Sequence, residues 1–163
     1  MALGHTLRNH TFTDGFSDTR ILRLASMATE VTFATDEVII ESGQRSEFFY
    51  LISEGSAAVE LRAPLFAVCV QALGPNQVCG WSSLLDDQNT LFQVRAREQV
   101  KALRFDGARL AELCRFDAEL GHEFYRRTLK TVFGRVKATE EKFAEMCGMK
   151  VRGQNAASGT HGG

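Results

Sequence analysis

Between residues 31 and 105 the chain alternates short β-branched and aromatic runs with turn residues at close intervals. The turn residues include Ser42-Gly43, Gly74-Pro75-Asn76 and Asp106-Gly107. Short runs separated by frequent turns are typical of antiparallel sheets that close into a small barrel or sandwich. We therefore expect eight strands, at 31–35, 38–41, 48–53, 57–62, 66–72, 77–79, 91–96 and 102–105.

Helical patterns flank this strand-rich region. A short helix is expected from Ser17 to about Ala28, because its apolar residues fall on one side and Ser17 or Asp18 can cap the first free amides. After Gly107 the pattern predicts a helix at 108–116 and a long one at 118–146. The expected fold class is mainly β with flanking helices: an eight-stranded β-roll (double-stranded β-helix or jelly roll) with a long C-terminal helix.

Length and composition fit one domain. The 163 residues are 44% hydrophobic and 24% charged, which is enough to bury a real core. We expect this domain to span 17–147, including the long helix. The polar residues 1–16 are predicted to be a flexible N-terminal arm, and the glycine-rich residues 148–163 a disordered tail.

The long helix carries a regular apolar seam. Its members are separated alternately by four and three residues, the heptad spacing of a coiled coil, and one of them is polar: Tyr125, Leu129, Val132, Val136, Thr139, Phe143 and Met146. Such a seam needs a partner surface, so we expect a homodimer through this helix. The basic residues of the same helix are interpreted as its exposed face: Arg126, Arg127, Lys130, Arg135 and Lys137.

The net charge and the positions of cysteine and histidine argue against several classes of function. A net charge of −1 gives no general attraction to nucleic acid or to an anionic membrane, and no segment is apolar enough to span a bilayer. The four cysteines include no CxxC pair, which favours reduced thiols in a cytoplasmic protein. None of the histidines lies on a predicted strand, and Cys69 with Cys79 would supply only two thiolates. We expect no metal, no cofactor and no catalytic residues.

Several motifs in the strand region resemble one known family. The stretches Val38–Gly43 and Phe48–Gly55 resemble the "I-x-x-x-G … F-Y-x-I-x-x-G" hairpins of cyclic-nucleotide-binding domains, the CRP/FNR-like effector domains. Leu73–Gly80 resembles the family's "L-G-x-G-x-x-F-G" approach to the phosphate-binding cassette, and Ser83-Leu84-Leu85 with Val94-Arg95-Ala96 resembles the rest of it. The resemblance covers about 17–146 and also implies dimerisation through the long helix.

The cassette departs from the family where the nucleotide would be held. Members that bind cyclic nucleotides have a glutamate for the ribose hydroxyl after the glycine that corresponds to Gly80, and here that position is Trp81. The phosphate-binding arginine falls on Thr90, and Phe92 stands where alanine is usual. An indole and a hydroxyl cannot reproduce the charge-assisted contacts. We expect a degenerate ligand cassette formed by Gly80, Trp81, Ser82, Ser83, Thr90, Leu91 and Phe92.

Two functions of different classes are compatible with these residues. The first is a non-catalytic regulatory or accessory subunit that docks on a larger complex. Domains resembling this one occur in multi-subunit redox enzymes, including soluble NAD-reducing hydrogenases. The second is a sensor for a ligand other than cyclic AMP or GMP, such as a nucleotide held by the Ser82 and Ser83 amides. A transcription factor is not expected, because no helix-turn-helix pattern follows the long helix. Trp81 either packs in the core, or it closes a remodelled pocket or anchors a partner.

Overall fold

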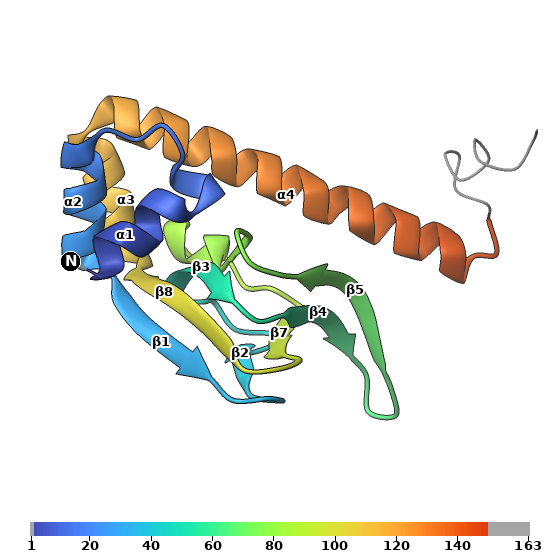
Figure 1. The fold of residues 1–163 in the computed structure, drawn as a ribbon. Coiled ribbons are helices and arrows are strands. Elements are labelled where there is room, and N and C mark those ends of the chain that lie inside the picture. The colour runs from blue at the N-terminus through green and yellow to red at the C-terminus, as the bar shows by residue number, and fades with distance from the viewer. Residues whose placement is uncertain (1, 150–163) are drawn as a thin grey trace, which may run out of the picture.

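The computed structural model describes residues 2–149 of the chain. Within that range eight strands form two four-stranded antiparallel sheets (Figure 1). The first sheet has the order β1 (Thr29–Phe33), β8 (Val100–Asp106), β3 (Phe48–Glu54), β6 (Val78–Cys79). The second has the order β2 (Val38–Ile40), β7 (Gln93–Ala96), β4 (Ala57–Arg62), β5 (Ala67–Leu73). The predicted fold class is confirmed.

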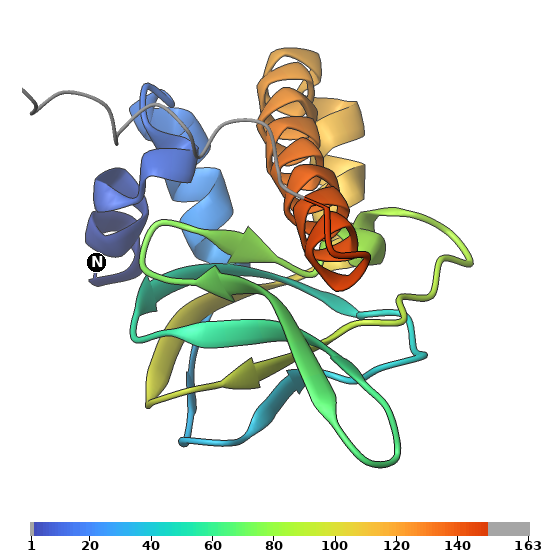
Figure 2. The same cartoon turned by 90° about the vertical axis from the view of Figure 1, so that its right-hand side faces the viewer.

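The helices gather on one side of the roll. They are α1 (Ala2–Asn9), η1 (Thr11–Thr13), α2 (Asp18–Met27), η2 (Trp81–Leu84), α3 (Gly107–Phe116) and α4 (Ala118–Met146). Figure 2 looks along α4 and shows the strands below it and the N-terminal helices beside it. No helix within 2–149 combines the length and the apolar character that a bilayer crossing requires. The expected tail at 148–163 lies outside the described residues, except for Gly148 and Met149.

Two apolar cores stabilise this arrangement. One lies between the two sheets and contains Ile52, Val59 and Val100. The other lies between the β1-β8-β3-β6 sheet and the helices, where Phe49 and Phe124 have ring centroids 5.1 Å apart. Because α4 contributes Phe124 to this second core, the first part of the long helix is fixed against the roll.

The N-terminal segment is folded, and the expectation of a flexible arm at 1–16 is wrong for the residues described. Leu7 of α1 is fully buried, and Phe12 of η1 packs 5.0 Å from Phe124. Leu3 also packs against this core. The composition of this segment is polar, but Leu3 and Leu7 lie on the same face of α1, which makes the helix amphipathic. The segment covers apolar surface that α2 and α4 leave open.

His10 links this segment to the sheet and is buried. Its Nδ1 accepts from the Phe12 amide at 3.2 Å, and its Nε2 lies 3.0 Å from the Ile52 carbonyl oxygen. These two bonds fit a neutral ring that carries its proton on Nε2. Burial lowers the pKa of His10 below its ordinary value, despite its hydrogen bond to Ile52.

The free energy of unfolding should therefore fall as the pH drops below about 6.5, the pKa of histidine in an unfolded chain. In that range the unfolded state binds a proton that the folded state excludes, so acid favours unfolding. Urea titrations between pH 5 and 8 should show this slope for the wild type and a smaller slope for His10→Gln. The exposed His122 provides the control, since His122→Gln should keep the wild-type slope. Equal slopes for all three proteins would contradict the role of His10.

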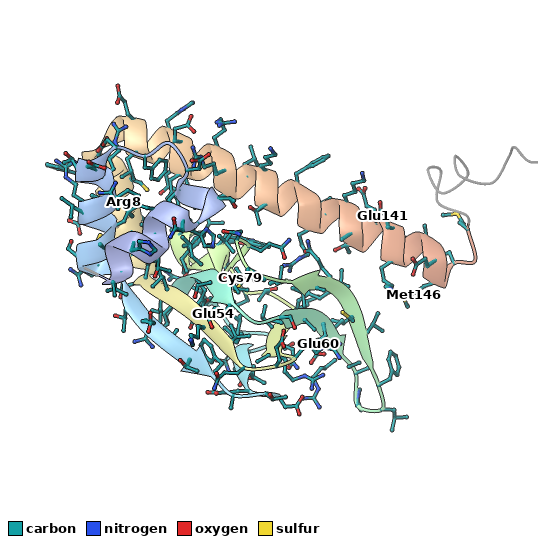
Figure 3. All side chains as sticks on the ribbon, in the orientation of Figure 1. Arg8, Glu54, Glu60, Cys79, Glu141 and Met146 are labelled. Atoms are coloured by element: carbon teal, nitrogen blue, oxygen red, sulfur yellow. The ribbon has the colours of Figure 1, made fainter. Side chains whose placement is uncertain are left out.

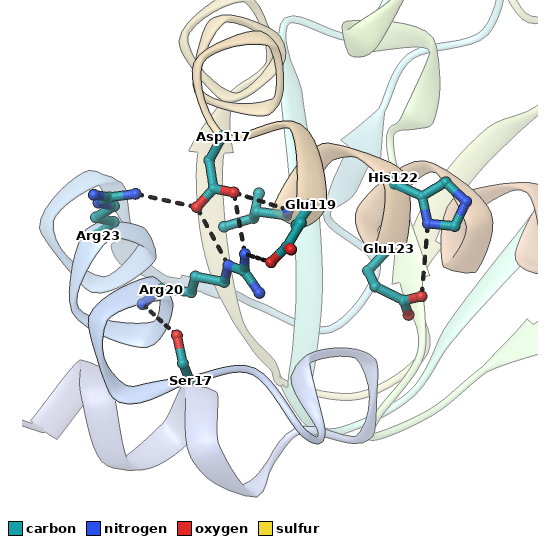
Figure 4. Close-up of polar contacts among 8 residues, drawn as sticks. Ser17, Arg20, Arg23, Asp117, Glu119, His122 and Glu123 are labelled. Carbon is teal, nitrogen blue, oxygen red and sulfur yellow. Dashed lines mark hydrogen bonds and ion pairs between the residues drawn. The ribbon is translucent and has the colours of Figure 1, made fainter.

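The start of α4 is held by an ion cluster that joins it to α2 (Figure 4). Asp117 caps the helix by accepting from the Leu120 amide at 3.1 Å, and Arg20 Nε lies 3.2 Å from the same carboxylate. Arg23 contacts Asp117 at 3.1 Å, and Arg20 also reaches Glu119 at 2.6 Å. The Leu120 amide and Arg20 hold the pKa of Asp117 below its ordinary value. The cluster fixes the direction in which α4 leaves the roll.

Beyond its first turns α4 runs over the strands and past β5 (Figure 1). Glu141 and Met146 lie on this far part, whereas Cys79 lies inside the roll (Figure 3). Most of the predicted seam is exposed: Tyr125, Leu129, Val136, Phe143 and Met146. The other two members, Val132 and Thr139, are half-buried. The seam is thus a real apolar surface in the single chain.

Candidate ligand pocket

The pocket is built where β6 turns into η2. Gly80 makes this turn with φ +85°, and an added Cβ would meet the Phe48 carbonyl oxygen at 2.1 Å. Only glycine fits that close approach and that left-handed backbone. The buried Ser83 hydroxyl donates to the Gly80 carbonyl oxygen at 2.6 Å and so fixes the short helix.

The opposite wall comes from the loop before β7. The Gly43 amide donates to the Thr90 carbonyl oxygen at 2.6 Å, and the Ser42 hydroxyl donates to the Leu91 carbonyl oxygen at 2.6 Å. These bonds attach the loop to the turn between β2 and β3. The Thr90 hydroxyl accepts from the Phe92 amide at 3.2 Å, which brings Thr90 and Phe92 to the same rim.

The space between these walls is small. Its volume is about 40 Å³, and it is lined by Ile40, Cys79, Gly80, Trp81, Ser82, Thr90, Phe92, Val94 and Arg135. Five members of the predicted cassette are therefore brought together: Gly80, Trp81, Ser82, Thr90 and Phe92. Two are not, since Ser83 is buried beneath the turn and Leu91 is 73% exposed.

Sequence reasoning missed Arg135. It was expected on the exposed face of the long helix, but it is only 9% exposed and lines the pocket. Its guanidinium carbon lies 4.9 Å from the centre of the Trp81 ring, and its Nε donates to Gln71 Oε1 at 2.5 Å. Trp81 is thus both a packing residue and a wall of the pocket, which joins the two roles that the sequence left open.

Arg127 is a second exception to the expected exposed basic face. It donates to the carbonyl oxygens of Phe12 and Asp14 at 2.6 and 2.7 Å, and its guanidinium lies over the Phe16 ring. Nothing in the spacing of the basic residues distinguishes Arg127 and Arg135 from their exposed neighbours. The only sign that Arg135 is buried is its polar partner Gln71, and this residue lies 64 positions away in the sequence.

The charged side chain in the lining of the pocket is a cation, Arg135. Burial lowers the pKa of Arg135 to about 10, so the guanidinium stays charged at neutral pH. Burial raises the pKa of Cys79 to about 12, so its thiol is neutral there. No carboxylate lines the pocket. Among residues 2–149, moreover, no three His, Cys, Asp or Glu side chains are grouped as metal ligands would be.

Solved structures share this fold. A putative cyclic nucleotide-binding protein from Geobacter metallireducens is 24% identical with a TM-score of 0.72, and the alignment covers 83% of this chain and 99% of that one. The regulatory subunit of a cAMP-independent protein kinase A from Trypanosoma brucei is 22% identical with a TM-score of 0.66 over 87% of this chain, which spans about half (49%) of the trypanosomal chain.

A variant of the trypanosomal subunit is also similar. It carries three substitutions, one of them threonine to arginine, and is described as bound to cAMP in its A site. It is 20% identical with a TM-score of 0.59, over 87% of this chain and 49% of that one. At these identities the likeness concerns the fold.

No curated protein matches the chain. A family model does: the cyclic nucleotide-binding domain matches residues 30–117, which include most of β1, strands β2 to β8, the pocket walls from η2 and from the loop before β7, and α3, but not Arg135 of α4. That match spans more than half of the 163 residues and agrees with the strand order of the roll. The chain therefore belongs to the cyclic nucleotide-binding domain family.

Proposed function

We propose that this chain is a non-catalytic regulatory or accessory module whose pocket no longer takes cyclic AMP or cyclic GMP. The observation that carries the proposal is the volume of about 40 Å³ left in the pocket. Ligand pockets for small organic molecules commonly measure roughly 300–1,000 Å³. The residues that fill the space are the chain's own: Phe92 from the loop, Trp81 from η2 and Arg135 from α4.

The chemistry of the walls supports the same conclusion. At the position of the ribose-binding glutamate the pocket has Trp81, and at that of the phosphate-binding arginine it has Thr90. Charged hydrogen bonds contribute about 1.5–3 kcal/mol each, so losing both weakens affinity by roughly two to four powers of ten. The trypanosomal subunit offers a parallel, because its cAMP-bound variant contains a threonine-to-arginine substitution.

The module is proposed to act through its surfaces. The exposed seam of α4 is where a second copy of the chain would pack, giving a homodimer. The similarity to a kinase regulatory subunit supports a regulatory role in general terms. Docking on a larger complex, such as a multi-subunit redox enzyme in the cytoplasm, remains part of this proposal and follows from the family resemblance alone.

A second candidate function is a sensor for a different ligand. One observation favours it: a buried cation, Arg135, lines the remaining space and has no carboxylate beside it there. The ligand would have to be far smaller than a nucleotide.

Calorimetric titration of the wild-type protein with cyclic AMP and cyclic GMP tests the proposal. At protein concentrations of about 100 μM, which detect dissociation constants well above the micromolar range, neither nucleotide should give saturable heat. The negative result is interpretable only if the sample is folded, which far-ultraviolet circular dichroism of the same sample establishes. Binding of either nucleotide at micromolar affinity would overturn the proposal that the pocket is closed to cyclic nucleotides.

A further inference from the structure

Arg135 is a buried cation without an acidic partner. The side chain is 9% exposed, and within 2–149 its guanidinium has a single hydrogen bond, from Nε to Gln71 Oε1. Trp81 supplies the face of a ring and no acceptor. Glu60, a buried charge elsewhere in the roll, is paired: it accepts from Arg95 at 2.7 Å.

This arrangement is unfavourable unless something neutralises it. Removing a charge from water is costly, and buried charges in proteins are normally paired or bound to an ion. A guanidinium carries five N–H donors, and the amide oxygen of Gln71 takes only one of them. No side-chain nitrogen within 2–149 is both fully buried and without a hydrogen-bond partner, so the donors that Gln71 does not use reach solvent-accessible space. There an anion can replace water as their acceptor.

The other polar side chains of the pocket can donate hydrogen bonds to an anion. The Ser82 hydroxyl accepts from the Ser46 amide at 3.4 Å, and the Thr90 hydroxyl accepts from the Phe92 amide at 3.2 Å. Each hydroxyl proton is thereby left free to donate. With the Cys79 thiol neutral and no carboxylate in the lining, the pocket offers donors and one positive charge.

We infer that the pocket binds a compact inorganic anion of about chloride or nitrate size, held by the Arg135 guanidinium with the Ser82 and Thr90 hydroxyls. The volume of about 40 Å³ exceeds the ~10–15 Å³ that one water needs and excludes a nucleotide. The inference rests on the proposed function, because it takes the pocket to be closed to cyclic nucleotides. Binding would tie α4 to η2 across the pocket and so make the position of the long helix depend on the anion.

The experiment measures thermal unfolding and Trp81 fluorescence while chloride or nitrate replaces gluconate at constant ionic strength. Trp81 is the only tryptophan, so its emission reports on the pocket. Gluconate is too large for the space and controls for general salt effects. For the wild type we expect saturable emission changes and a melting temperature that rises by roughly 3–5 °C for each tenfold increase of anion above its dissociation constant.

Two variants distinguish the pocket from the surface. Arg135→Met keeps the length of the side chain and should lose the anion dependence, while Lys137→Met, exposed on the same helix, should keep it. In gluconate alone Arg135→Met should melt no lower than the wild type, because it removes an unpaired buried charge. Should Arg135→Met fail to fold, Thr90→Val leaves the cation in place and should weaken the apparent affinity several-fold.

Anion effects that do not saturate, or that persist unchanged in Arg135→Met, would overturn the inference and leave the proposed function standing. Binding of a cyclic nucleotide in the same assay would instead overturn the proposed function. The two failures are therefore distinguishable within one set of titrations.

Discussion

Light scattering after gel filtration is expected to give about twice the 18.1 kDa chain mass for the wild type and the mass of one chain for the double variant Val132→Asp, Val136→Asp. Val136 is 46% exposed and Val132 is half-buried in the middle of the α4 seam, so both lie where a second helix would pack. In the dimer each aspartate would be buried without a partner, and four such charges would face one another.

The matched control introduces two aspartates on the same helix outside the seam. Lys130→Asp with Lys137→Asp alters two exposed positions of the same helix and should leave the dimer mass unchanged. Circular dichroism should show that both double variants keep their helix content. A wild-type protein that runs as a folded monomer at high micromolar concentration would contradict self-association, and the apolar seam would then need a different partner.

The roll could be predicted from the sequence because its determinants are local. Turn residues such as Gly43, Gly55 and Gly80 stand where the backbone adopts positive φ, and the β-branched runs between them supply the strands. The cap residues Ser17 and Asp106 accept from the Arg20 and Arg109 amides and begin α2 and α3. Each of these signals is readable within a few residues.

The N-terminal helix and the contribution of Arg135 from α4 to the pocket were not predictable in the same way. Leu3 and Leu7 give a weak apolar pattern in eight residues, and its burial depends on surface that α2 and Phe124 present. Burial of Arg135 depends on where α4 crosses the roll, which the cluster around Asp117 sets at the far end of the helix. Distant contacts of this kind leave no periodic signal in the chain.

We propose that Trp81, Phe92 and Arg135 close the pocket of the family to cyclic nucleotides. Opening the pocket should therefore restore binding. Trp81→Glu and Thr90→Arg return the two charged contacts, and Trp81→Glu also removes the indole from the space. Phe92→Ala and Arg135→Ala remove the other two groups that fill it. A control variant with Trp81→Glu and Thr90→Arg alone keeps Phe92 and Arg135, so it tests whether the charged contacts suffice while these two side chains still occupy the space.

Titration of cyclic AMP into the folded fourfold variant, beside the wild type and the control, is the most direct measurement. We expect no saturable binding by the wild type, and an affinity for the fourfold variant that is tighter by roughly two to four powers of ten. The control should remain weak because Phe92 and Arg135 still occupy the cavity. Micromolar binding by the wild type, or a folded fourfold variant that binds no better than the wild type, would show that these side chains do not close the pocket.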